Sequence, residues 1–149
     1  MKVKQLLFSI IVAAFLSSAI GEDHKTLEVG NTAPKIETIK GTNVVDDANS
    51  QGKTKVISFW NPKKPASRIA NKKLSLQYGK GDNEKVEFIS ICTDSDENLM
   101  KEVMKIDGVN SQNTYSYSEI PSRVFKDYGV EDSPKAYIIT PEGKISQII

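Results

Sequence analysis

The chain is poor in the two side chains that most often carry redox and metal chemistry. Its 149 residues include one cysteine, Cys92, and one histidine, His24. A single cysteine excludes an internal disulfide, the bond that commonly stabilises proteins in oxidising compartments. Stability must therefore come from a hydrophobic core, and the chain is long enough to bury one in a single domain.

The sequence also lacks a strong excess of either charge. Lysine and arginine number 20 against 19 acidic residues, which gives a formal net charge of +1. So balanced a chain has no general attraction for polyanions, and we expect no nucleic-acid partner. Repeats, low-complexity tracts and linkers are absent as well, and the apolar fraction of 38% is typical of a globular protein.

The first 21 residues have the pattern of a secretory signal peptide. Lys2 and Lys4 precede an apolar stretch over 6–20, and the end of this pattern, over 17–21, is rich in small residues. The alternative is a retained N-terminal anchor, but the stretch is short for a membrane span and contains serines. With no cysteine near the cleavage site, a lipoprotein anchor is not expected. We therefore predict a periplasmic or secreted protein that keeps no stable membrane anchor after residues 1–21 are removed.

Apolar runs and chain breakers after this point predict an α/β fold. Residues 55–60 are apolar enough to form a strand buried on both faces, and Pro65 suits the first turn of the helix that follows. The first two strands must be parallel with a right-handed crossover, whereas the last two, joined by a tight turn at 141–144, must be antiparallel. We expect a short hairpin over 36–48 and loop or short strand over 109–120. The strands are predicted over 55–60, 85–92, 135–140 and 145–149, and the helices over 65–78, 96–106 and 122–128.

Helical spacing selects the side chains expected to face the core. The candidates on the first helix are Ile69, Leu74, Leu76 and Tyr78, and those on the second are Leu99, Val103, Met104 and Ile106.

Three stretches resemble one known family. Val29 to Pro34 is similar to a "VGxxAP" opening, Lys55 to Trp60 to a "KVVLVNFWA" strand, and 128–145 to "YGVxGxPTTFLIDxDGKI". In this order and spacing they resemble the thioredoxin superfamily, in particular its exported TlpA/ResA-type members, over 27–149. The resemblance implies a thioredoxin-like mixed β-sheet flanked by helices, and we expect no cofactor. Members of that family usually continue into a last helix, whereas this chain stops at Ile149, so we expect either a chain cut short or one bare sheet face.

The sequence departs from the family at its reactive turn. Aligned on Phe59 and Trp60, the two cysteines of the family motif FWAxWCxPC fall on Lys64 and Ser67. Exchange between thiols and disulfides needs a thiolate and a second, resolving thiol. Lysine and serine supply neither, so the resemblance implies the fold without the dithiol activity, and we expect no catalytic residue here.

Two segments are the candidate binding site. The resemblance implies that Pro134 is a cis proline facing the turn and that the backbone beside it pairs with an extended peptide. The alternative is that Pro134 is only structural. We interpret the chain as a non-catalytic binding or accessory module for an extended polypeptide or envelope protein. Its candidate binding residues are Trp60, Asn61, Lys63, Lys64, Pro65, Ser67, Arg68, Ser133 and Pro134.

The charges and hydroxyl of the turn allow two further interpretations. Lys63, Lys64 and Arg68 surround an expected helix N-terminus, where backbone N–H groups and the helix dipole attract anions such as carboxylate or phosphate. The alternative is that three long cations point into solvent. Ser67 would need a neighbouring base to act as a nucleophile, and none is visible.

Cys92 has a structural and a redox interpretation. At the end of an apolar strand it is expected to be a small buried residue. The alternative is a thiol oxidoreductase that retains a redox role through Cys92 or through a partner's thiols. A peroxidase is disfavoured, because its reactive cysteine would belong in the turn over 62–67. A third hypothesis is a decaying copy that has no activity.

Three remaining patterns point to structure first. The acidic set Asp94, Asp96 and Glu97 lacks the glycine and the final glutamate of a calcium loop and is interpreted as the start of a helix. Cleavage after Gly21 would place His24 third in the chain, where it could complete a square-planar Cu(II) or Ni(II) site, although we expect no functional metal. Tyr115 and Tyr117 alternate on an extended segment, and a peptide-facing role for them has no further support.

Overall fold

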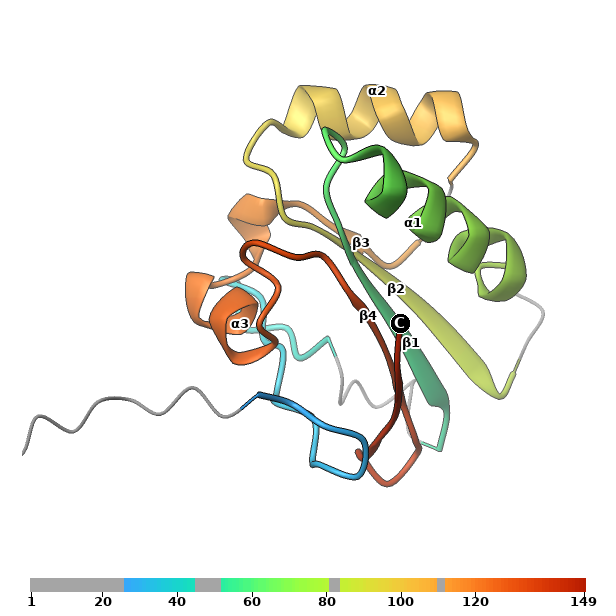
Figure 1. Ribbon diagram of the computed structural model, residues 1–149, viewed down its shortest axis with the longest axis vertical. Coiled ribbons are helices and arrows are strands. Elements are labelled where there is room, and N and C mark those ends of the chain that lie inside the picture. Colours follow the sequence, from blue (N-terminus) through green and yellow to red (C-terminus); the bar gives the residue numbers. More distant parts are fainter. Residues whose placement is uncertain (1–25, 45–51, 81–83, 110–111) are drawn as a thin grey trace, which may run out of the picture.

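The computed structural model describes residues 26–44, 52–80, 84–109 and 112–149. In these ranges one five-stranded sheet, in the order β3-β2-β1-β4-β5, is flanked by helices (Figure 1). The signal-peptide and His24 predictions, and residues 45–48 of the expected hairpin, lie outside the described residues. The elements are β1 (Thr54–Trp60), α1 (Pro65–Tyr78), β2 (Val86–Cys92), α2 (Glu97–Asp107), β3 (Thr114–Tyr115), the 3-10 helix η2 (Tyr117–Glu119), α3 (Ser122–Asp127), β4 (Ala136–Ile139) and β5 (Ile145–Ile148).

Strand β1 is the centre of the sheet, and its sequence explains why. Every residue of β1 after Thr54 is buried, as expected of an apolar run covered on both faces. It pairs in parallel with β2, so that Trp60 lies opposite Cys92, and antiparallel with β4. The predicted parallel first pair and antiparallel last pair, β4 with β5, are both confirmed.

Side chains that alternate along β1 and β2 divide the core between two faces. Ile57 and Phe59 join the larger cluster, which also contains Val124 and Phe125 of α3 and the N-terminal residue Ile36. We call this the α3 face. Val56 and Trp60 point the other way, into two smaller clusters with α1 and α2, and we call this the α1 face.

The N-terminal segment is attached to the far end of the chain. Gly30 N donates to Ile145 O at 2.7 Å, and Ala33 N donates to Gly143 O at 2.9 Å. Beyond it, a bridge between Glu37 and Asn43 forms the predicted hairpin as far as it is described. Residues separated by more than a hundred positions thus close the edge of the α3 face.

Helix α1 buries only some of the side chains predicted for it, and Tyr78 is partly buried against the cluster that contains Leu74. Leu74 is buried against Val56 and Phe88, but Ile69 and Leu76 are 55% and 57% exposed. Their place on the inner face is taken by Asn71 and Ser75, both buried. Helical periodicity locates an apolar stripe on the helix. It does not reveal that a hydrogen-bond partner on the sheet will turn a polar face of the helix toward the core. The polar partner here is Ser90 of β2, whose Oγ donates to Asn71 Oδ1 at 3.2 Å.

Helix α2 has the caps that its sequence predicts. Asp96 Oδ1 accepts from Leu99 N at 3.0 Å, and Gly108 ends the helix in the left-handed conformation with φ of 67°. Met100 and Val103 are its buried residues. The prediction of Ile106 as a core residue is wrong, since that side chain is 72% exposed.

The remaining predictions concern the short elements and the last part of the chain. Residues 109–120 contain the two-residue strand β3, which pairs in parallel with β2. No helix follows β5 within residues 112–149. None of the helices in the described residues has the length and hydropathy that a membrane span requires.

Candidate functional site

The turn between β1 and α1 is held by its own side chains. Asn61 Oδ1 accepts a hydrogen bond from Lys63 N at 2.8 Å, and Asn61 N donates to Ser67 Oγ at 2.9 Å. Lys64 N donates to Asn61 O at 3.1 Å. Asn61 and Ser67 therefore fix the shape of the turn, and their polar groups are engaged within the protein.

Helix α1 begins without the usual capping group. Lys64 occupies the N-cap position, where its side chain can accept no hydrogen bond, and the first turn contains no acidic residue. Pro65 follows at the first helical position, where its missing N–H costs no hydrogen bond. The start of α1 thus depends on Pro65 and on the hydrogen bonds of Asn61 and Ser67 for its geometry.

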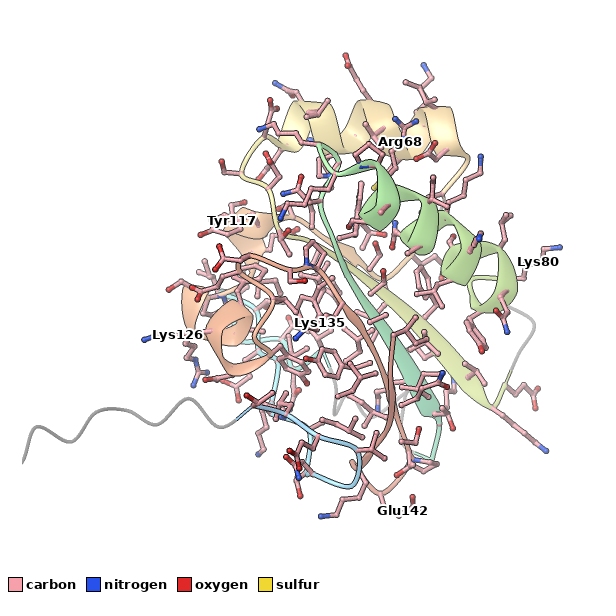
Figure 2. All side chains as sticks on the ribbon, viewed as in Figure 1. Arg68, Lys80, Tyr117, Lys126, Lys135 and Glu142 are labelled. Atoms are coloured by element: carbon pink, nitrogen blue, oxygen red, sulfur yellow. The ribbon has the colours of Figure 1, made fainter. Side chains whose placement is uncertain are left out.

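The two predicted segments meet at one cleft, which has a volume of about 350 Å³. One wall is the start of α1 and the other is the loop that leads into β4, on which Lys135 lies (Figure 2). Phe59 N donates to Lys135 O at 3.0 Å, which holds this loop against β1. The residues that line the cleft are Ser58, Phe59, Lys64, Ala66, Ser67, Ala70, Leu74, Asp132, Ser133, Pro134, Lys135, Ala136 and Ile149.

Lys64 links the two walls of this cleft. Its Nζ donates to the backbone oxygen of Asp132 at 2.5 Å, across 68 positions of sequence. Lys64 is therefore a structural tie between α1 and the loop before β4.

The three cations of the turn have three different acceptors. Lys63 forms an ion pair with Asp94 at 3.0 Å, and Arg68 forms a bidentate pair with Asp107 of α2 at 2.5 and 2.7 Å. Lys64 is engaged with a carbonyl, as described above. The predicted anion site needs these charges to converge on one point, and they do not.

The carboxyl partners of two of these cations titrate below their ordinary ranges. Hydrogen bonding from Arg68 lowers the pKa of Asp107 despite its partial burial. Burial raises the pKa of Asp94, but hydrogen bonds from the backbone of Asp96 and from Lys63 outweigh it, so the net shift is downward. Both acids are thus ionised at neutral pH and hold their cations in place.

The peptide bond before Pro134 differs from the expectation. The described residues contain no cis peptide bond, so Ser133–Pro134 is trans. The cis form was implied only by the family resemblance, and the trans form is the more stable one for an X–Pro bond by about 0.5–1 kcal/mol. Ser133 is exposed and Pro134 is half-buried at the edge of the cleft.

Trp60 and Cys92 lie in the core of the α1 face. Trp60 is 1% exposed and packs with Cys92, Met100 and Val103, so the prediction that it faces a partner does not hold in this structure. Its Nε1 has no hydrogen-bond partner among the described residues. Cys92 is fully buried, as the structural interpretation predicted, and burial raises the pKa of its thiol to about 11.

The acidic set after β2 has structural partners. Asp94 pairs with Lys63, Asp96 caps α2, and the carboxylate of Glu97 accepts from Ser118 Oγ. The hydrogen bond from Ser118 lowers the pKa of Glu97. Within the residues that are described, no group of three potential metal ligands occurs.

The two tyrosines near β3 have different surroundings. Tyr115 packs against the large cluster of the α3 face. Tyr117 is 38% exposed and its ring stacks on Phe125 with centroids 4.9 Å apart. Neither of them lines the cleft beside α1.

Sequence reasoning missed several residues of the cleft. Ala66, Ala70 and Leu74 recur at intervals of four, which is the signature of one stripe along a helix. Two alanines in that stripe leave the space that becomes the cleft. Asp132, Lys135 and Ile149 carry no local signal, because tertiary folding alone brings them to α1.

Several solved structures share this arrangement. A thioredoxin-like protein from Parabacteroides distasonis matches with a TM-score of 0.69 at 24% identity, over 83% of this chain and 88% of that one. The thioredoxin domain of a thiol-disulfide oxidoreductase from Bacteroides vulgatus matches with a TM-score of 0.63 at 22% identity, over 83% and 89%. A secreted Mycobacterium tuberculosis disulfide oxidoreductase matches with a TM-score of 0.57 at 22% identity, over 78% and 82%. At these identities the likeness establishes a thioredoxin-like fold.

A family model gives the assignment that the structures alone do not. None of the curated proteins matches this chain. The model of the AhpC/TSA family matches residues 29–148, which include every helix and strand described above. The chain therefore belongs to the AhpC/TSA family and has a thioredoxin-like fold.

Proposed function

We propose that this protein is an exported member of the AhpC/TSA family that has lost dithiol chemistry and binds an extended polypeptide in the cleft beside α1. One observation carries the proposal. Lys64 and Ser67, the positions that align with the two cysteines of the TlpA/ResA-type motif, line the same cleft as Ser133 and Pro134. The family's reactive turn has thus kept its position in the fold, while its side chains now shape a binding surface.

The absence of a reactive thiol supports the chemical half of this proposal. The chain has one cysteine, and Cys92 lies buried on β2 rather than at the turn. With its pKa raised to about 11, the thiol stays protonated at neutral pH. Thiol–disulfide exchange and peroxide reduction both require an accessible thiolate, which Cys92 does not supply.

The walls of the cleft support a polypeptide ligand. Ala66, Ala70, Leu74 and Ile149 give it an apolar lining, and the backbone of Asp132 and the ammonium of Lys64 lie at its rim. An apolar side chain of an extended segment fits such a surface. Because Pro134 is trans, we favour a mode of binding in which side chains of the polypeptide enter the cleft over one in which its backbone pairs with Ser133.

Export is supported by the signal-peptide pattern over residues 1–21 and by the description of the M. tuberculosis relative as secreted. In that compartment, proteins with the dithiol exchange disulfides. A relative without thiols at the turn would bind related polypeptides without changing their oxidation state. The partner's own thiols would then determine any redox outcome.

Binding is tested by filling the cleft. Ala70→Phe places a large ring between α1 and Pro134, and Lys105→Phe adds the same ring to the exposed side of α2 as a control. An array of short peptides of varied composition is the probe. We expect peptides with apolar residues to bind the parent protein and to bind Ala70→Phe at least about tenfold more weakly, with Lys105→Phe unchanged. Equal binding to all three proteins, or no binding to any, contradicts the proposal.

The second candidate is a residual thiol oxidoreductase, which the relatives' chemistry favours. Disulfide reductase turnover by the natural protein is compared with turnover by a Lys64→Cys/Ser67→Cys double variant. We expect the natural protein to be inert and Cys92 to react with a maleimide only after unfolding, because the thiol is buried. Turnover by the natural protein, or rapid labelling of its native state, would show that Cys92 is reactive and would replace the proposal with the redox function.

A further inference from the structure

Helix α1 presents apolar side chains to solvent and polar ones to the sheet. Ile69 and Leu76 are each more than half exposed, whereas Asn71 and Ser75 are buried beneath the helix. Ile69 and Leu76 are seven positions apart, so they share one face and lie about 10 Å apart along the helix axis. Together they place two large aliphatic side chains on one exposed helix face, where a partner could cover them.

Lysines fill the space between these two apolar residues. Lys72 and Lys73 follow Ile69 by three and four positions and precede Leu76 by four and three, which places all four on one face. Both lysines are exposed, and among the described residues no acidic side chain forms an ion pair with Lys73. We call Ile69, Lys72, Lys73 and Leu76 the outer face of α1.

This region has an excess of positive charge, which the rest of the chain does not have. Residues 61–80 contain six basic residues and no acidic one, whereas residues 84–149 contain seven basic and twelve acidic residues. Two of the six, Lys63 and Arg68, are neutralised by Asp94 and Asp107. Figure 2 shows Lys80 projecting from the opposite end of the helix to Arg68. Apart from Lys64 in the turn, whose ammonium donates to a backbone oxygen, the charge that remains extends along the helix.

An apolar notch adjoins the outer face at the start of the helix. It has a volume of about 320 Å³, and Pro62, Pro65 and Ile69 supply its apolar wall. The Arg68–Asp107 ion pair and Lys72 form its other side. The notch lies on a different side of α1 from the cleft, whose helical residues are Ala66, Ala70 and Leu74.

We propose that the outer face of α1 docks an acidic segment of a partner protein, with one apolar side chain of that segment seated in the notch. Complementary charge favours an acidic segment: Asp107 lies near Lys72 but is already paired with Arg68, and Lys73 has no acidic neighbour on α1. The notch favours a protein partner over a lipid surface. A side chain can enter the notch, whereas a flat bilayer would pass over it without contact. Two half-exposed aliphatic residues also offer a membrane little apolar area.

This docking surface is independent of the proposed function. The partner segment would lie along the outer side of α1, and the polypeptide of the cleft would lie between α1 and the loop before β4. Both could be occupied at once, because the residues that line the cleft and the residues of the outer face do not overlap.

A displayed library of random short peptides, selected on the purified natural protein, tests the inference. Enriched peptides are then measured against Lys72→Glu/Lys73→Glu, against Ile69→Asn, and against Lys101→Glu/Lys105→Glu, which makes the same charge change on α2. We expect a class of peptides that joins acidic residues to a large apolar one. Its affinity should fall by about tenfold or more in the first two variants and stay within about twofold in the third.

Three results would overturn the proposal. One is a library in which no peptide depends on Lys72, Lys73 or Ile69. Another is dependence on the lysines alone by peptides without apolar residues, which indicates ion exchange. The third is sedimentation of the protein with phosphatidylglycerol vesicles through Lys72 and Lys73 when no peptide uses them, which indicates a lipid surface. Melting temperatures of all variants confirm that each is folded, and Ala70→Phe separates this surface from the cleft.

Discussion

The two faces of the sheet are built on different principles. The α3 face is one continuous cluster in which aromatic rings interlock: Phe59 and Tyr128 have centroids 4.9 Å apart, and Tyr128 and Tyr137 5.1 Å apart. The α1 face consists of two smaller clusters separated by polar residues, including Asn71 and Ser90. The α3 face therefore contributes most of the apolar burial in the described residues, and the α1 face contributes less.

The two faces also differ in what holds them together and in what they expose. Hydrogen bonds from Tyr128 Oη to Pro34 O at 2.7 Å and from Tyr137 Oη to Tyr128 O at 2.5 Å reinforce the α3 face. The α1 face is held partly by Lys64 and by the Arg68–Asp107 pair, and it carries the cleft, the notch and the exposed Ile69 and Leu76. A surface with modest packing can accommodate a partner without disturbing the main core.

Phe59→Ala is expected to have the largest effect on stability. The ring is buried in the α3 face, where it contacts Phe125, Tyr128 and Tyr137, and its removal leaves a large cavity. We expect the free energy of unfolding to fall by about 3–5 kcal/mol, measured by denaturant unfolding.

Leu74→Ala tests the α1 face with a smaller deletion. Leu74 is the one buried apolar residue of α1 and packs on Val56 and Phe88. Because its surroundings include polar groups and the adjoining cleft, we expect a smaller loss, about 2–3 kcal/mol, in the same measurement. A loss equal to that of Phe59→Ala would remove the distinction between the two faces.

Tyr137→Phe isolates one hydrogen bond of the α3 face. The change removes the hydroxyl that donates to Tyr128 O and leaves that buried carbonyl without this donor. We expect a loss of about 1–2 kcal/mol in the free energy of unfolding. Tyr117→Phe, on a partly exposed ring, is the control and should change stability very little. Equal effects of the two substitutions would show that the hydrogen bond is not what stabilises this face.

The Arg68–Asp107 pair is expected to make the α1 face sensitive to acid. The pKa of Asp107 is lowered in the folded state, so the pair stabilises the protein above the ordinary aspartate pKa of about 4 and is lost as the pH falls through the lowered value. Asp107→Asn should therefore lower the melting temperature at neutral pH by a few degrees at most, and the difference from the parent should vanish in strong acid. A difference that persists or grows in acid would contradict this role.

The strands were predictable because their apolar runs are unambiguous. The orientation of α1 was not, since Ile69 and Leu76 satisfy the helical pattern yet point outward while Asn71 is held inward by Ser90. At the candidate site, the family resemblance located the turn and the loop at Pro134. It did not indicate the ion pairs of Lys63 and Arg68, whose partners lie 31 and 39 positions away without any local signal.

The attachment of residues 30–33 to residues 143–145 has a consequence for the order of folding. These backbone hydrogen bonds join segments at great sequence separation, and closing so long a loop is entropically costly. They should therefore form late, after β1 and β2 have paired through their local crossover. Substitutions that weaken this attachment should accelerate unfolding and leave the folding rate nearly unchanged. The attachment of the N-terminal segment would then determine how long the native state persists.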